Sequence, residues 1–190
     1  ELAALLPHRK FLLLESWGLD QADKQKLESK ISRLPNVEFR GRTLDMKRIY
    51  QSTSLLLMPS QWEEAFGRVA VEAGAYGIPT VGSRIGGIPE AVGDGGVLLS
   101  PADPADRWAM HIERILNDKS VYAELSSKAL AHSARPELSP KIAAQRFVNV
   151  VHGHVLRSGK ARSLAAGASP TAVADGLNIQ QLSAHGRASN

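Results

Sequence analysis

The sequence of 190 residues has no cysteine, few aromatic residues and no long apolar run. Without cysteine there are no disulfides, thiolate metal sites or cysteine nucleophiles, which fits a reducing compartment and predicts a cytoplasmic location. No apolar run reaches the roughly 18 residues that a membrane-spanning helix requires, and no basic segment precedes a signal-like apolar stretch. The remaining composition, 43% hydrophobic and 22% charged, is typical of a globular protein with a buried core.

The net charge of +4 is concentrated near the end of the chain. The segment 157–190 contains four cations and one anion, which leaves a net charge of +1 for residues 1–156. Aromatic residues make up only 5% of the sequence, and no basic stripe is interleaved with aromatic platforms. This pattern argues against a nucleic-acid partner. The Gly/Ala/Ser-rich composition of 157–190 predicts a disordered tail.

Short apolar runs alternate with helical patterns along the first 156 residues. Strands are predicted at 11–14, 37–40, 55–58, 80–82 and 96–99. Helices are predicted at 20–34, 44–51, 66–76, 103–117, 120–134 and 139–156. This alternation predicts one α/β domain over 1–156, with a Rossmann-like parallel sheet of about five or six strands and helices on both faces. Ligands of such sheets bind beyond the carboxyl ends of the strands.

The segment 59–73 joins a predicted buried strand to a helix and carries the strongest chemical signal. Gly67 lies at the predicted helix start, where a missing side chain lets a diphosphate approach free backbone N–H groups. Glu72 lies about 8 Å further along the helix, a distance that spans a phosphate and a ribose. Its carboxylate can accept hydrogen bonds from both hydroxyls of a vicinal diol. Glu64 precedes the helix and is expected near the group attached to the distal phosphate.

Each glutamate also has an ordinary explanation. Glu64 alone could be a solvated loop carboxylate that is favourable near a helix N-terminus, and Glu72 alone an exposed helix residue. Their joint placement around Gly67, directly after a strand, favours a functional interpretation.

A second loop with unusual composition follows the predicted strand at 80–82. Gly86 and Gly87 permit close backbone approach, and Pro89 suits the first turn of a short helix. The loop could enclose the sugar or phosphate end of a ligand. The alternative is a tight turn in which Glu90 only stabilises the helix N-terminus.

Several motifs occur in a fixed order. They are Pro59-Ser60, Glu64-Ala65-Phe66-Gly67, Glu72-Ala73, Gly77-Ile78-Pro79 and Gly86-Gly87-Ile88-Pro89-Glu90, followed by Asp103. This series resembles the donor-binding, C-terminal domain of the retaining glycosyltransferases of family 4, which have the GT-B fold. The resemblance is strong over about 53–117, weaker over 5–52 and absent after about 157.

The resemblance implies a metal-independent transfer of a sugar, with retention, from a nucleoside diphosphate sugar to an acceptor hydroxyl. It implies that Glu72 binds the donor ribose and that Glu64 is the catalytic residue beside the transferred sugar. The backbone at Phe66, Gly67 and Arg68 would bind the diphosphate. The turn at Gly41 and Arg42 would lie against the base.

The sequence also departs from the family pattern. Family members carry an Arg and a Lys after the first strand of this domain, and no such pair precedes Phe11. We therefore expect that first strand, and an N-terminal acceptor-binding domain, to lie upstream of Glu1. Position 65 holds Ala where Gly is frequent in the family. Family acceptors are often lipid-linked, which implies possible peripheral membrane contact. The alternative function is a non-catalytic nucleotide-binding or assembly module; an epimerase or phosphorylase of the same fold fits less well.

Overall fold

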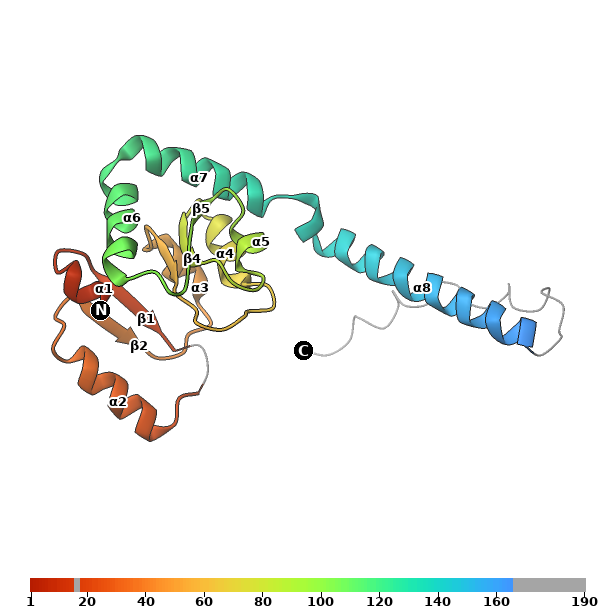
Figure 1. Ribbon diagram of the computed structural model, residues 1–190, viewed down its shortest axis with the longest axis horizontal. Coiled ribbons are helices and arrows are strands. Elements are labelled where there is room, and N and C mark those ends of the chain that lie inside the picture. The colour runs from red at the N-terminus through yellow and green to blue at the C-terminus, as the bar shows by residue number, and fades with distance from the viewer. Residues whose placement is uncertain (16–17, 166–190) are drawn as a thin grey trace, which may run out of the picture. The chain divides into compact units, whose positions relative to one another are not determined.

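The computed structural model describes residues 1–15 and 18–165 (Figure 1). The chain divides into two compact units, the first spanning Glu1–Leu138 and the second beginning at Ser139. The first unit contains all the strands found in the described residues. The α/β class predicted from the alternation of apolar runs and helical patterns is confirmed.

The five strands of the first unit are parallel and form two separate ladders. β1 (Phe11–Leu14) pairs with β2 (Val37–Arg40), with Phe11 opposite Val37. The second ladder has the order β3 (Leu56–Met58), β4 (Thr80–Ser83), β5 (Gly96–Leu99). Apolar runs predict each strand but do not specify its neighbour, so this division was not foreseen.

Helices connect and cover the strands. The helices of the first unit are α1 (Leu2–Leu5), α2 (Gln21–Ile31), α3 (Met46–Gln51), α4 (Arg68–Gly74), α5 (Ile88–Val92), α6 (Ala105–Asn117), α7 (Lys119–Ser133) and the 3₁₀ helix η1 (Pro136–Leu138). Aspartate caps start three of them: Asp20 before α2, Asp45 before α3 and Asp118 before α7 each accept a hydrogen bond from a first-turn N–H group.

Both faces of the three-stranded sheet are covered, as predicted. On one face Val81 of β4 belongs to a buried cluster with Trp108 of α6. On the other face Met58 of β3 packs with Ala70 of α4 and Ile88 of α5. Successive residues of a strand point to opposite faces, so a continuous apolar run can serve both layers. The sheet is therefore the centre of the fold, and its strand ends position the loops that follow.

The second unit contains α8 (Pro140–Ala165). Two sequence-based boundaries differ from this result. The compact first unit ends at Leu138 and not at residue 156, and α8 extends nine residues into the segment predicted to be a disordered tail from 157. Ala, Leu, Lys and Arg in 157–165 are good helix formers, which a composition argument overlooks. The remaining residues of that predicted tail, 166–190, lie outside the described residues. No described helix has the length and apolar content needed to cross a membrane.

Candidate functional site

Two loops meet at the carboxyl edge of the three-stranded sheet. Residues 59–67 lead from β3 into α4, and residues 84–87 lead from β4 into α5. The backbone N–H of Gly87 donates to the carbonyl oxygen of Glu64 over 2.7 Å. Gly86 has φ = +55°, and a Cβ atom there would lie 2.5 Å from the same oxygen. The paired glycines thus have a packing role: they let one loop lie against the backbone of the other.

The Glu64 side chain is held within its own loop. The Ser60 hydroxyl, two residues after β3, donates to Glu64 Oε1 over 2.6 Å. Both residues are half-buried. This hydrogen bond therefore ties the carboxylate to a residue close to the end of β3. Ser60 belongs to a motif noted in the sequence, but its contact with Glu64 was not anticipated.

The N-terminus of α4 has the open form that the sequence predicts. The helix begins at Arg68, and Gly67 before it is buried in the left-handed conformation with φ = +78°. A Cβ atom at Gly67 would lie 3.3 Å from Met58 Cε, so glycine suits both the backbone and the space. Gly67 provides no side-chain cap, and the Arg68 and Val69 N–H groups have no acceptor among the described residues. Their binding of a diphosphate, like that of the Phe66 and Gly67 backbone, stays a prediction.

Glu72 lies one turn into α4 and has two different partners. The Tyr50 hydroxyl donates to Oε2 over 2.9 Å. The Arg68 guanidinium donates to Oε1 from Nε and Nη2 over 3.4 and 3.2 Å. The Glu72 side chain is 39% exposed and that of Arg68 is 83% exposed. One carboxylate oxygen is therefore anchored from the interior, and the other contacts an exposed cation.

Tyr50 was not identified from the sequence. It is a buried residue of α3 and its ring lies 5.3 Å from that of Tyr76. Burial, followed by the hydrogen bond to Glu72, raises the pKa of the Tyr50 phenol, so the phenol remains a proton donor. A buried tyrosine generally needs a hydrogen-bond partner for its hydroxyl. This rule is the one sequence-level reason to look for an acceptor near Tyr50.

The remaining predicted site residues, Gly41, Arg42 and Glu90, share no hydrogen bond with Glu64 or Glu72 in the described part of the chain. Gly41 and Arg42 follow β2 in an exposed loop and share no hydrogen bond with the segment 60–90 in the described part of the chain. The Glu90 side chain is exposed at the start of α5, where its charge favours the helix dipole. The Glu90 carbonyl accepts from His132 and Arg135 over 2.8 and 3.2 Å. These are backbone contacts, so both interpretations of the Glu90 carboxylate, as part of a ligand loop or as a helix-stabilising residue, stay predictions.

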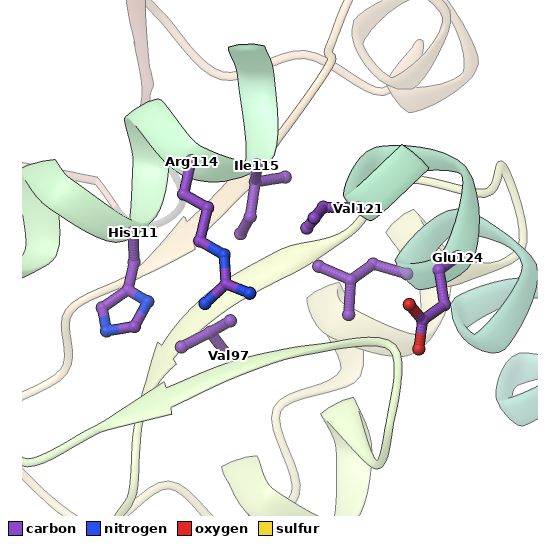
Figure 2. A pocket seen from close by; sticks show the side chains of 7 residues that line it. Val97, His111, Arg114, Ile115, Val121 and Glu124 are labelled. Atoms are coloured by element: carbon purple, nitrogen blue, oxygen red, sulfur yellow. The ribbon is translucent and has the colours of Figure 1, made fainter. Parts of the chain in front are cut away.

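A pocket of about 220 Å³ opens between β5, α6 and α7, away from these loops in sequence (Figure 2). Its lining consists of Val97, His111, Arg114, Ile115, Val121, Glu124 and Leu125. Figure 2 shows His111 and Arg114 on one helix and Glu124 on the other. Burial, with the positive charges of Arg107 and Arg114, lowers the pKa of His111. None of the predicted donor-binding residues lines this pocket.

Comparison with known proteins assigns the family. The sequence model of the family Glycosyl transferases group 1 matches residues 7–118, more than half of the chain. The chain belongs to this family. Among the proteins similar to it are D-inositol 3-phosphate glycosyltransferases. The one from Corynebacterium diphtheriae is 37% identical over 112 residues, covering 55% of this chain and 26% of the relative. The one from Mycobacterium marinum is 39% identical over 121 residues, covering 62% and 25%.

Solved glycosyltransferases share the fold of this group 1 chain. Anabaena Alr3699/HepE in complex with UDP-glucose superposes with a TM-score of 0.70 at 25% identity, covering 80% of this chain and 44% of HepE. The C-terminal domain of LpcC, a group 1 protein from Francisella tularensis, superposes with a TM-score of 0.50 at 21% identity, covering 60% and 61%. The structural neighbours are GT-B glycosyltransferases, so this chain has a GT-B glycosyltransferase domain fold. The matched segments correspond to about a quarter of the length of the curated relatives.

Proposed function

We propose that this chain is the donor-binding half of an enzyme that transfers a sugar, with retention, from a nucleoside diphosphate sugar to an acceptor hydroxyl. The observation that carries the proposal is the placement of Glu64 and Glu72 around the open start of α4, at the carboxyl edge of a parallel sheet. Membership of the Glycosyl transferases group 1 family and the likeness to HepE, solved with UDP-glucose, support a nucleotide sugar as donor.

In the proposed reaction, negative charge develops on the leaving diphosphate and must be stabilised. The bond between the anomeric carbon and the diphosphate oxygen breaks, and its electron pair stays on the diphosphate. The acceptor oxygen bonds to the anomeric carbon, and its proton passes to the leaving diphosphate or to solvent. The N–H groups at Phe66, Gly67 and Arg68 would stabilise the growing negative charge. By analogy with oxyanion holes, one such donor contributes about 3 kcal/mol to the transition state.

The two glutamates have separate proposed roles. Glu72 binds the ribose diol, and Glu64 acts beside the transferred sugar, where positive charge develops. Removing Glu64 should therefore reduce turnover more than donor affinity. We propose that this reaction needs no metal ion. Gly41 and Arg42 as base contacts, and Gly86 and Gly87 as a loop around the sugar or phosphate, stay predictions from the sequence.

We propose further that another strand and a second domain complete the enzyme. The doubly wound order of a Rossmann sheet is 3-2-1-4-5-6. The two ladders match this order with the central first strand left out, as β2-β1 and β3-β4-β5. Phe11 of β1 and Leu57 of β3 pack against the same buried cluster, which supports their belonging to one sheet. The match to the isolated C-terminal domain of LpcC supports the assignment of this chain to the C-terminal half.

The proposal is tested by an assay for transfer of a sugar to an acceptor. Full-length protein is incubated with nucleoside diphosphate sugars and a mixture of hydroxyl acceptors, and products are analysed by mass. A product heavier than an acceptor by one sugar residue, lost in Glu64→Ala, supports the proposal. Nucleotide binding without transfer would instead indicate the non-catalytic binding or assembly module. A cytoplasmic location and peripheral membrane contact stay predictions.

A further inference from the structure

We propose that Tyr50 is a positioning residue that holds the Glu72 carboxylate in the orientation required to accept both hydroxyls of the donor pentose. This inference rests on the proposed function, because it assumes that Glu72 is the pentose ligand. It adds a residue of α3 to a site otherwise formed by α4 and the loops before α4 and α5.

Of the two partners of Glu72, Tyr50 is held in place by the core and Arg68 is exposed to solvent. The Tyr50 side chain is buried, lies against the tilted ring of Tyr76 and packs in a cluster with Ala73 and Ile78, so its hydroxyl is held in place. Arg68 is 83% exposed and contacts Glu72 at 3.2 and 3.4 Å. Exposed pairs of this kind contribute little and exchange readily with other partners.

The two partners leave a defined acceptor surface on Glu72. An ionised carboxylate has about four lone-pair sites, and Tyr50 uses one of them on Oε2. An incoming diol can replace Arg68 on Oε1 and use the free site on Oε2. A carboxylate whose plane is already fixed loses less conformational freedom on binding, so pre-orientation by Tyr50 strengthens recognition of the diol.

A purely structural role of the Tyr50 hydroxyl can be distinguished from a positioning role by experiment. If the hydrogen bond only satisfies a buried phenol, its loss changes stability but not the preference for a ribose over a sugar without hydroxyls. If it positions Glu72, its loss reduces that preference. The preference for a ribonucleotide over its dideoxy analogue is therefore the readout that separates the two roles.

The experiment measures calorimetric affinities of full-length protein for UDP, GDP and ADP, and for the 2′,3′-dideoxy analogue of the one that binds most tightly. The variants are Tyr50→Phe, Glu72→Ala and the matched control Tyr76→Phe. Tyr76→Phe removes a neighbouring hydroxyl that makes no hydrogen bond in the described part of the chain. We expect Tyr50→Phe to reduce the ribose preference about tenfold, Glu72→Ala to abolish it and Tyr76→Phe to leave it unchanged.

The outcomes separate this inference from the proposed function. If Glu72→Ala abolishes the ribose preference but Tyr50→Phe retains it, Tyr50 is not a positioning residue and the proposed function is untouched. If Glu72→Ala retains the preference, or the wild type binds none of the three nucleotides, the pentose role of Glu72 fails and the positioning role fails with it.

Discussion

In the loop that follows β3, the Ser60 hydroxyl donates a hydrogen bond of 2.6 Å to the Glu64 carboxylate, four residues further along the chain. Ser60 lies two residues beyond the buried Met58, so the position of the carboxylate is linked directly to the sheet. Sites supported in this way are held more accurately than sites on unsupported loops. The proposed catalytic residue therefore depends on Ser60.

Replacing Ser60 should impair turnover more than binding. In Ser60→Ala, Glu64 loses its anchor and samples other rotamers, so we expect kcat to fall roughly tenfold while donor affinity changes less than about twofold. Steady-state kinetics and calorimetry measure the two quantities. Ser52→Ala is a matched control, because among the described residues the Ser52 hydroxyl bonds only to carbonyl groups of α3. Equal losses in the two variants would argue against a specific role of Ser60.

Replacing Gly86 should displace the Glu64 loop. A Cβ atom at position 86 would lie 2.5 Å from the Glu64 carbonyl oxygen and 2.7 Å from its nitrogen, in a backbone conformation with φ = +55°. We expect Gly86→Ala to cost about 2 kcal/mol or more in the free energy of unfolding, measured by urea denaturation. At Gly18 an added Cβ atom meets nothing within 4 Å, so Gly18→Ala should change stability by less than about 0.5 kcal/mol. A Gly86→Ala protein as stable as the control would contradict the packing described.

Acid should remove a stabilising link between the start of the chain and α6. Glu113 accepts from Arg9 Nε over 2.7 Å, and this contact lowers the pKa of the carboxyl from 4.5 to about 2. A depressed folded-state pKa contributes stability that is present above about pH 4.5 and lost as the pH falls towards 2. Because the Glu113 side chain is 28% exposed, we expect Glu113→Gln to cost only about 1 kcal/mol at neutral pH.

The check is the unfolding free energy of wild type and Glu113→Gln between pH 7 and pH 2. The difference should shrink as the pH falls through this window. Glu28→Gln serves as the control, because the exposed Glu28 side chain has no ion pair in the described residues. A difference that is independent of pH would mean that the Arg9 contact is not the source of the stability.

The sequence predicted those features that depend on local pattern. Phe11–Leu14 and Gly96–Leu99 are strands with the predicted bounds, because each is an apolar run flanked by polar or turn residues. A helix start beside Gly67 was also predicted, although α4 begins at Arg68 and not at residue 66. The left-handed conformation of Gly67 and the close approach of Met58 are seen only in the structure.

Features that depend on contacts between distant segments were not predictable in this way. The Tyr50 and Glu72 side chains are separated by 22 positions, and nothing in either local pattern pairs them. The sequence suggested that Gly86 and Gly87 permit close approach, but only the fold identifies the approaching group as the Glu64 loop. The short α1 helix, Leu2–Leu5, has too few residues to give a periodic signal.

The most direct test of the account is the affinity of full-length protein for a nucleoside diphosphate, measured by calorimetry with wild type and Glu72→Ala. Loss of the hydrogen bonds between a diol and a charged carboxylate should weaken binding of the best of UDP, GDP and ADP by about 10- to 100-fold. The exposed control Glu28→Ala should bind like the wild type. An unchanged nucleotide affinity in Glu72→Ala would contradict the central claim that this carboxylate binds the ribose of the donor.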